Sequence, residues 1–131
     1  MCLIPKLKNK WPECIETANE PITVYKLLFK DEHTGGISSP FVSYHYTPGK
    51  PEYSELYFDK TRKVISQGLH AYNDKQTAID AFMSYHDLYH GYTITPCLYT
   101  ATIPKDSKYV IGTMGDIVSN TLIIHETPFM V

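Results

Sequence analysis

One segment of the chain has helical periodicity, and the segments on either side of it have the composition of β-strands. From Ala78 to Tyr89, apolar residues recur at intervals of three and four. Asn73 and Gln76 have the spacing of a capping box at the start of this helix. Gly91 suits the left-handed backbone that commonly follows a helix. The sequence therefore predicts one principal helix between Asn73 and Gly91.

The flanking segments are rich in β-branched and aromatic residues, and several of them alternate between apolar and polar positions. Turn residues separate them, as in the Gly/Ser/Pro-rich stretch that follows the first one. The predicted strands are Ile22 to Lys30, Phe41 to Tyr46, a short one near Leu56 and Phe58, Leu69 to Tyr72, and segments within 97–104, 108–112 and 118–126. This order of elements indicates an α+β domain with a mostly antiparallel sheet of about six strands.

The length and composition fit a single domain. A chain of 131 residues with 43% hydrophobic residues can build one substantial core. Pro5, Pro12 and Pro21 interrupt the first part of the chain. We therefore expect an N-terminal arm over residues 1–21 and a single α+β domain over residues 22–131.

Charge and cysteine content exclude some classes of protein. Twelve basic and fourteen acidic residues give a net charge of −2, with no basic stripe, which argues against a nucleic-acid partner. The beginning of the chain lacks the apolar core of a signal peptide, and no apolar run is long enough to span a bilayer. Three cysteines without a CxxC pair are typical of reduced thiols. We expect a cytoplasmic protein without a membrane partner. Its eleven tyrosines suit a β-sheet surface, a stacking or sugar-contacting surface, or a protein interface.

A metal site is one interpretation of the helix. His86 and His90 lie four residues apart and share a helix face, and Cys97 follows closely, so the three could hold zinc. A metalloprotease motif would place a glutamate beside the first histidine, where this chain has Asp87. His86 also falls on the apolar stripe. We therefore predict packed side chains here and no metal site.

The segment from Gly68 to Tyr72 is the strongest candidate for a site. Gly68 permits close approach of the backbone or a positive φ. His70 and Tyr72 are two residues apart on an extended segment and so project to the same face. They would present a titrating ring and an aromatic platform beside the start of the helix. The alternative is a strand in which His70 is hydrogen-bonded in the core.

The order of several motifs resembles a family of small uncharacterised proteins from bacteriophages and gut bacteria. In that family an aromatic segment with a Gly-Lys turn precedes a Gly-(Phe/Leu)-His-Ala element and a short helix. The resemblance extends over about Ile22 to Glu126 and implies no settled activity. The matching segments are VYKLL from Val24, SPF to GK over Ser39 to Lys50, GLHAY from Gly68, and IPKDSKYVIG leading to SNTLIIHE.

A more distant resemblance is to the ADP-ribosyltransferase fold. It would place Val24 to Lys26 on an early strand, GLHAY with Ala78 in the middle, and Ser119 to Ile124 on a late strand. The resemblance implies a cleft that holds the nicotinamide of NAD between tyrosine rings, with a carboxylate on the ribose.

The chain departs from that pattern at its catalytic positions. Asn120 or Thr121 stands where the late strand should carry a glutamate, and Lys26 replaces an arginine or histidine. The nearby carboxylates are Asp116 and Glu126, before the strand and at its end. Without a carboxylate at the catalytic position, the transfer reaction loses the main electrostatic stabilisation of its transition state.

We therefore expect a small non-enzymatic binding domain of phage or mobile-element type, without a cofactor, that takes a protein or a nucleotide-like ligand on a Tyr/His-lined face. One alternative is an ADP-ribosyltransferase-like enzyme that uses NAD, with Glu126 or Asp116 as a displaced carboxylate. Another is a structural protein whose tyrosines lie in a homo-oligomer interface. The expected ligand-binding residues are Tyr25, Lys26, Gly68, His70, Tyr72 and Asn120.

Overall fold

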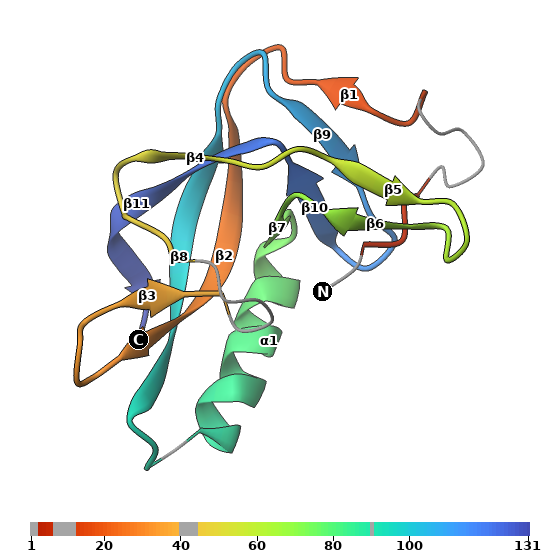
Figure 1. Ribbon diagram of the computed structural model, residues 1–131. Helices are drawn as coiled ribbons and strands as arrows, with labels where there is room; N and C mark the ends of the chain where they lie inside the picture. Colours follow the sequence, from red (N-terminus) through yellow and green to blue (C-terminus); the bar gives the residue numbers. More distant parts are fainter. Residues whose placement is uncertain (1–2, 7–12, 40–44, 90) are drawn as a thin grey trace.

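A computed structural model describes residues 3–6, 13–39, 45–89 and 91–131 of the chain. Within these residues the protein is mostly antiparallel β-sheet with one helix, which confirms the α+β class (Figure 1). The elements are β1 (Glu16–Thr17), β2 (Ile22–Asp31), β3 (Ile37–Ser38), β4 (Pro51–Tyr53), β5 (Tyr57–Asp59), β6 (Val64–Gln67), β7 (Leu69–Tyr72), α1 (Lys75–Leu88), β8 (Ile94–Ile103), β9 (Lys108–Ile111), β10 (Asp116–Ser119) and β11 (Thr121–Met130).

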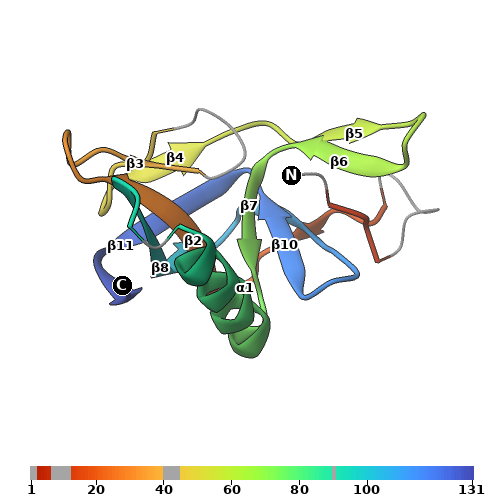
Figure 2. The same cartoon turned by 90° about the horizontal axis from the view of Figure 1, so that it is seen from below.

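The strands are more numerous than the six expected, because several have only two to four residues. Nine of those described form one sheet in the order β1-β9-β10-β7-β2-β8-β11-β4, with β3 paired to β2. Strands β5 and β6 form a separate hairpin. Figure 2 shows this hairpin far from α1, with the curved sheet between them.

The middle of the sheet has one long ladder and one narrow junction. Strands β2 and β8 pair over their whole length, from Ile22 with Ile103 to Asp31 with Ile94. Strand β7 pairs over its whole length with β10 but meets β2 only where Tyr72 faces Tyr25. Beyond that pair β2 and β7 diverge, so backbone groups of β7 on this side need other partners.

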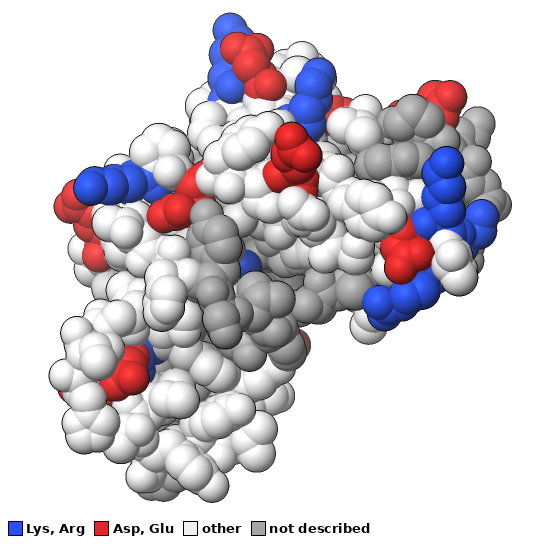
Figure 3. Space-filling view, in the orientation of Figure 1, with Lys and Arg blue, Asp and Glu red and all other residues white. Residues whose placement is uncertain are grey.

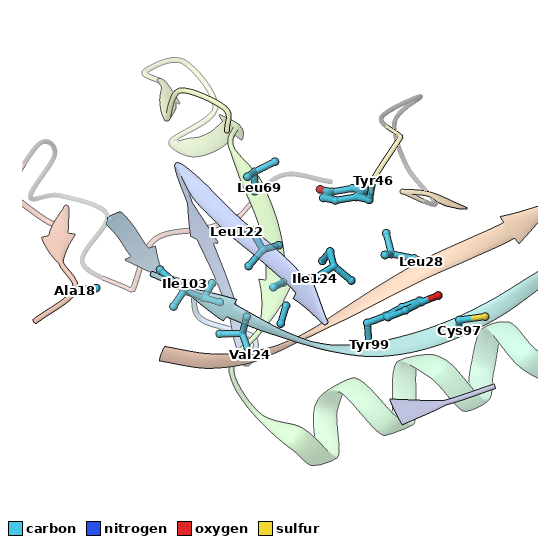
Figure 4. Close-up of a cluster of buried hydrophobic side chains, with 13 residues drawn as sticks. Ala18, Val24, Leu28, Tyr46, Leu69, Cys97, Tyr99, Ile103, Leu122 and Ile124 are labelled. Carbon is cyan, nitrogen blue, oxygen red and sulfur yellow. The ribbon is translucent and has the colours of Figure 1, made fainter. Parts of the chain in front are cut away.

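The main core lies inside the curve of the sheet. Alternate residues of each strand face it, as the two-residue period of a strand requires. In Figure 4, Leu122 of β11 points toward Val24 of β2 and Ile103 of β8, and Leu69 of β7 belongs to the same cluster. Tyr46 points into the same cluster opposite Leu28 and Tyr99 in that view. This core therefore joins the two halves of the sheet across the β2–β7 junction.

Helix α1 covers the other face of the sheet. Ala78 and Phe82 pack against Leu27 of β2 and Leu98 of β8, in a second buried cluster. These positions continue the alternation, since Leu27 and Leu98 lie next to core residues of the opposite face. Packing the apolar stripe of α1 against this face of the sheet removes both apolar surfaces from water.

The start of α1 differs from the expected capping box. Asp74, not Asn73, is the N-cap, and its carboxylate accepts a hydrogen bond from the Thr77 N–H at 2.9 Å. The Asn73–Gln76 capping box is therefore wrong, because the helix begins one residue later than the pattern placed it. The side chain of Gln76 instead donates to Asp80 one turn further on, at 2.9 Å. At the other end the C-cap is Tyr89.

The described residues of the predicted N-terminal arm lie against the sheet. Leu3 exchanges backbone hydrogen bonds with Ile65 and is fully buried in a third cluster, beside Val110 and Val118. Strand β1 adds an edge to the sheet by pairing with β9. Most of the strand expected from Phe41 to Tyr46 lies outside the described residues, which resume at His45.

Candidate functional site

Gly68 is required by the packing of its backbone. Its φ of +141° lies in a region that residues with a side chain rarely adopt. A Cβ placed there would lie 2.5 Å from Cγ2 of Val118 and 2.8 Å from Cδ2 of Leu56. The close approach expected at Gly68 is therefore an approach to the protein's own side chains.

His70 is a mostly buried, neutral ring. Its Nδ1 lies 3.2 Å from the Gly68 carbonyl oxygen, while its buried Nε2 has no hydrogen-bond partner among the described residues. Burial, followed by the positive charge of Lys26, lowers the pKa of His70 to about 4. The imidazole is thus uncharged near neutral pH and offers no titrating group there.

Lys26 lies in the interior at the junction between β2 and β7. Only 5% of the residue is exposed, and it faces the main core between Val24 and Leu28. Its Nζ donates to the backbone carbonyl of His70, at a point where β2 and β7 have separated. The lysine therefore takes the place of a missing strand partner.

The surroundings of the Lys26 amine are aromatic. Nζ lies 5.2 Å from the centroid of the Tyr46 ring, within the range of a cation–π contact. Across the ladder, Lys26 pairs with the buried Tyr99. In the described part of the chain, no carboxylate forms an ion pair with the amine. Burial lowers the pKa of Lys26 to about 7, so charged and neutral amine coexist near neutral pH.

Tyr25 and Tyr72 lie on the helix-covered face, opposite to Lys26. They are register partners on β2 and β7, and both pack beside the α1 cluster. The ring centroid of Tyr25 is 6.1 Å from that of Phe129 on β11. The Nζ of Lys75, in the first turn of α1, lies 5.0 Å from the Phe129 centroid.

A second set of rings meets at the C-terminal end of α1. The centroid of Phe29 on β2 is 5.7 Å from Tyr85 and 5.0 Å from Tyr89, both in edge contacts. Tyr89 in turn lies 5.8 Å from Tyr92. Since Tyr25 and Phe29 share one face of β2, these rings continue the first set along the helix. We call the whole set the aromatic row; its members are Tyr25, Phe29, Tyr72, Tyr85, Tyr89, Tyr92 and Phe129.

Most members of the aromatic row were not among the residues expected from the sequence. Tyr85 and Tyr89 are four residues apart, which places them on one helix face, and this spacing was an available signal. The contact with Phe29 depends on how α1 crosses β2, which no local pattern reveals.

The row ends among exposed apolar side chains. Leu88 is 66% and Tyr92 is 68% exposed, and Ile94 at the start of β8 is also partly exposed. In Figure 3 the part of the molecule around the end of α1 and the start of β8 is almost entirely free of charged side chains. Elsewhere on the face shown, basic and acidic side chains are interspersed without a basic stripe.

Asn120 does not join the other expected site residues. It lies between β10 and β11, where its Oδ1 accepts from the Lys108 N–H at 3.0 Å. The backbone N–H of Asn120 donates to the Lys108 carbonyl, also at 3.0 Å. These bonds tie the β10–β11 turn to β9, so the amide is engaged in holding the backbone.

The two carboxylates considered for a transferase lie in different surroundings. Asp116 is buried and is the register partner of Tyr72, but its Oδ1 accepts from the Met114 N–H at 3.1 Å. Its proximity contributes, after burial, to a raised pKa of the Tyr72 hydroxyl. Glu126 is exposed on β11 and lies against Gly49.

The residues considered for zinc are only partly described. His90 lies outside the described residues, and His86 is an exposed side chain whose Nδ1 is 3.9 Å from Asp87. Cys97 is a buried free thiol whose pKa is raised by burial, which disfavours the thiolate. Among the residues that the structure describes, no group of three His, Cys, Asp or Glu side chains is placed to hold a metal ion.

No protein-family model, curated protein or solved structure matches the chain significantly. The described residues also contain no helix with the length and hydropathy needed to cross a membrane.

Proposed function

We propose that the chain is a small non-enzymatic binding domain that docks a partner protein on the exposed end of the aromatic row. The observation that carries this proposal is the exposure of Leu88, Tyr92 and Ile94 at the end of α1, in the connection that follows it and at the start of β8, with Tyr92 against Tyr89 of that row. Exposed aromatic and aliphatic side chains that adjoin one another are typical of protein interfaces. Tyrosine in particular supplies much apolar area while its hydroxyl keeps a hydrogen-bond partner.

The geometry of the row favours a protein over a nucleotide-like ligand. The rings at its exposed end meet edge to face, and each already packs against a neighbour. Glu32 lies at the same end of the sheet, where its carboxylate accepts from the Thr95 hydroxyl at 2.6 Å. This negative charge would repel a phosphate group.

The transferase alternative finds little support in the described residues. The position of the expected glutamate is Asn120, and its side chain holds a turn. Asp116 is engaged by the backbone of its own loop. A domain that binds without catalysis needs neither group.

The test is to capture partner proteins from a lysate of the source organism with the native chain and with a variant changed only at the exposed end of the aromatic row. We expect the variant to lose this capture. The paired substitution Leu88→Gln with Tyr92→Ser removes the two most exposed apolar groups there and keeps good helix propensity at position 88. We expect it to weaken capture of a specific protein at least about tenfold, because central aromatic residues supply much of the binding energy.

Tyr53→Ser is the matched control, since Tyr53 is 63% exposed on β4, outside the aromatic row. It should leave capture unchanged, and circular dichroism should show both variants folded. Equal capture by the paired variant and the native chain would refute the proposal. Light scattering distinguishes the homo-oligomer alternative: a dimer that the paired variant converts to monomer would identify the partner as a second copy.

A further inference from the structure

Acidic side chains adjoin the exposed end of the aromatic row. Asp31 pairs with Ile94 across the β2–β8 ladder, so these two side chains lie on the same face of the sheet, the one on which α1 lies. Asp87 precedes Leu88 in α1, and its side chain is 82% exposed. Lys30, the basic residue beside Asp31 in β2, points to the opposite face because neighbouring residues of a strand alternate. We call this surface the acidic end; its members are Asp31, Asp87, Leu88, Tyr92 and Ile94.

The described part of the chain supplies no lysine or arginine to these carboxylates. Its one ion pair joins Asp87 to the neighbouring His86, with 3.9 Å between Oδ1 and Nδ1. Asp31 accepts two backbone N–H groups of the following turn through Oδ1, at 2.8 and 3.4 Å, and its Oδ2 accepts from no described residue. A guanidinium group from another molecule could bond to the free oxygen and stack on the Tyr92 ring. The acidic end is therefore suited to a basic partner.

A basic surface that meets this requirement lies on the chain itself, in the turn between β5 and β6. Lys60, Arg62 and Lys63 of this turn are exposed, and none of them forms an ion pair in the described structure. Asp59 is the carboxylate of the turn, and its Oδ1 accepts from the backbone N–H groups of Thr61 and Arg62 at 3.0 and 3.1 Å. These bonds fix the backbone and leave the basic side chains free. In Figure 3, basic side chains gather around this part of the molecule, which we call the basic turn.

The acidic end and the basic turn cannot meet within one molecule. Figure 1 shows the β5–β6 hairpin and the C-terminal end of α1 at opposite ends of the molecule. We propose that the occupant of the acidic end is the basic turn of a second copy of this chain. The proposal rests on the proposed function, because it uses the same docking surface and names its partner. Since the two surfaces differ, the association is head-to-tail, and it leaves a free surface of each kind for further copies.

The two surfaces match in apolar area as well as in charge. Tyr57 of β5 is 57% exposed beside the basic turn, as Leu88 and Tyr92 are exposed at the acidic end. Arginine and tyrosine are residue types that protein interfaces favour, because each combines a large contact area with hydrogen bonding. Opposite charges on the two surfaces would orient the copies before these side chains pack.

Analytical ultracentrifugation of the full-length chain tests the contact. We expect the average mass to rise with protein concentration at an ionic strength of about 0.02 M, and this rise to be lost at about 0.5 M, because salt screens exposed charges. Lys60→Glu with Arg62→Glu reverses the charge of the basic turn and should weaken self-association at least about tenfold. Asp31→Asn with Asp87→Lys should do the same at the acidic end, since asparagine keeps the Oδ1 acceptor of the turn.

A mixture of the two charge variants provides the decisive comparison. Each variant alone carries like charges on both surfaces, whereas in the mixture every contact between unlike variants joins opposite charges. The mixture should therefore associate although neither variant does. Lys50→Glu with Lys105→Glu is the matched control, because it makes the same change in net charge at exposed lysines outside both surfaces and should leave association unchanged.

The outcomes separate this proposal from the proposed function. A native chain that stays monomeric at every concentration, or one whose association survives both charge variants, would overturn the second copy as the partner. Lysate capture that still depends on Leu88 and Tyr92 would then leave the docking surface standing with a different partner. Association that the charge variants abolish and their mixture restores would support the second copy.

Discussion

A charged Lys26 amine opposes folding, because in the native state it has exchanged water for a backbone carbonyl and an aromatic ring. The unfolded chain restores the ordinary lysine pKa of 10.5, against about 7 in the fold. Between these values the unfolded state binds more protons than the native state, so stability rises with pH. Below pH 7 both states are protonated and the penalty is complete.

We expect the free energy of unfolding, measured relative to that of Lys26→Met, to rise by about 2 kcal/mol between pH 7 and pH 9. Urea titrations of both proteins at each pH provide the measurement. The neighbours of the amine should not interfere, since the pKa of His70 is lowered to about 4 and that of Tyr99 is raised by burial. Lys105→Met, at an exposed lysine, should show no such slope. A flat difference for Lys26→Met would contradict the placement of the amine.

At the scale of single residues, the sequence predicted only part of what the structure shows at the expected site. Because alternate residues of a strand face the same side, the sequence correctly implied that His70 and Tyr72 share one side of β7. The glycine that precedes them indicated close packing of the backbone. Burial of Lys26 could not be foreseen, because it depends on the divergence of β2 from β7 after a single register pair. Asn120 was placed by a distant resemblance, and its actual partner is the backbone of Lys108.

Among the elements, helices and strands with a sustained repeat of apolar residues were predictable from the sequence, and elements without such a repeat were not. Strand β2 and helix α1 each carry a repeat long enough to fix their type, and β7 is bounded by a glycine and an asparagine. Strands β1 and β4 are two and three residues long, too short to show a period. They exist because β9 and β11 offer free edges to which the chain returns.

The helix start shows how local competition decides a boundary. Asn73 and Asp74 are both good N-cap residues, and the choice between them follows from the turn: the Asn73 N–H donates to the Gly115 carbonyl at 3.0 Å. This bond keeps Asn73 in the extended backbone that follows β7. Asp74 is then the first residue free to cap the helix.

Asp74→Ala should lower the melting temperature by about 4 °C, whereas Asn73→Ala should have little effect. The hydrogen bonds from Thr77 lower the pKa of Asp74, so the cap stabilises the fold above the unfolded pKa of this carboxyl. The contribution is lost as the pH falls through the lower, native value. Scanning calorimetry of both variants near neutral pH checks the assignment; equal effects would favour Asn73 as a second cap.

For the molecule as a whole, the described N-terminal residues contribute buried side chains to the core. Leu3 is fully buried beside Ile65 and Val118, while its neighbour Ile4 is 41% exposed. The third cluster thus joins the beginning of the chain, the β5–β6 hairpin and β10. Stability of the hairpin should depend on residues more than fifty positions away in sequence.

Leu3→Ala should reduce the free energy of unfolding by about 3 kcal/mol, which is typical of a buried leucine replaced by alanine. Ile4→Ala removes a similar apolar volume at an exposed position and should cost less than about 1 kcal/mol. Urea denaturation of the two variants provides the comparison. Similar losses in both would show that the N-terminal residues do not complete the third cluster.

The β2–β8 ladder also has a kinetic consequence. It joins Ile22–Asp31 to Ile94–Ile103, so the central pair of strands is made from segments whose paired residues are 63 to 81 positions apart in the chain. Closing so long a loop loses chain entropy before any ladder hydrogen bond forms. Proteins dominated by such distant pairings fold in about milliseconds to seconds, far more slowly than helical bundles. During that interval α1 has no sheet to cover, and its apolar stripe together with the tyrosines beside it stays open to other chains.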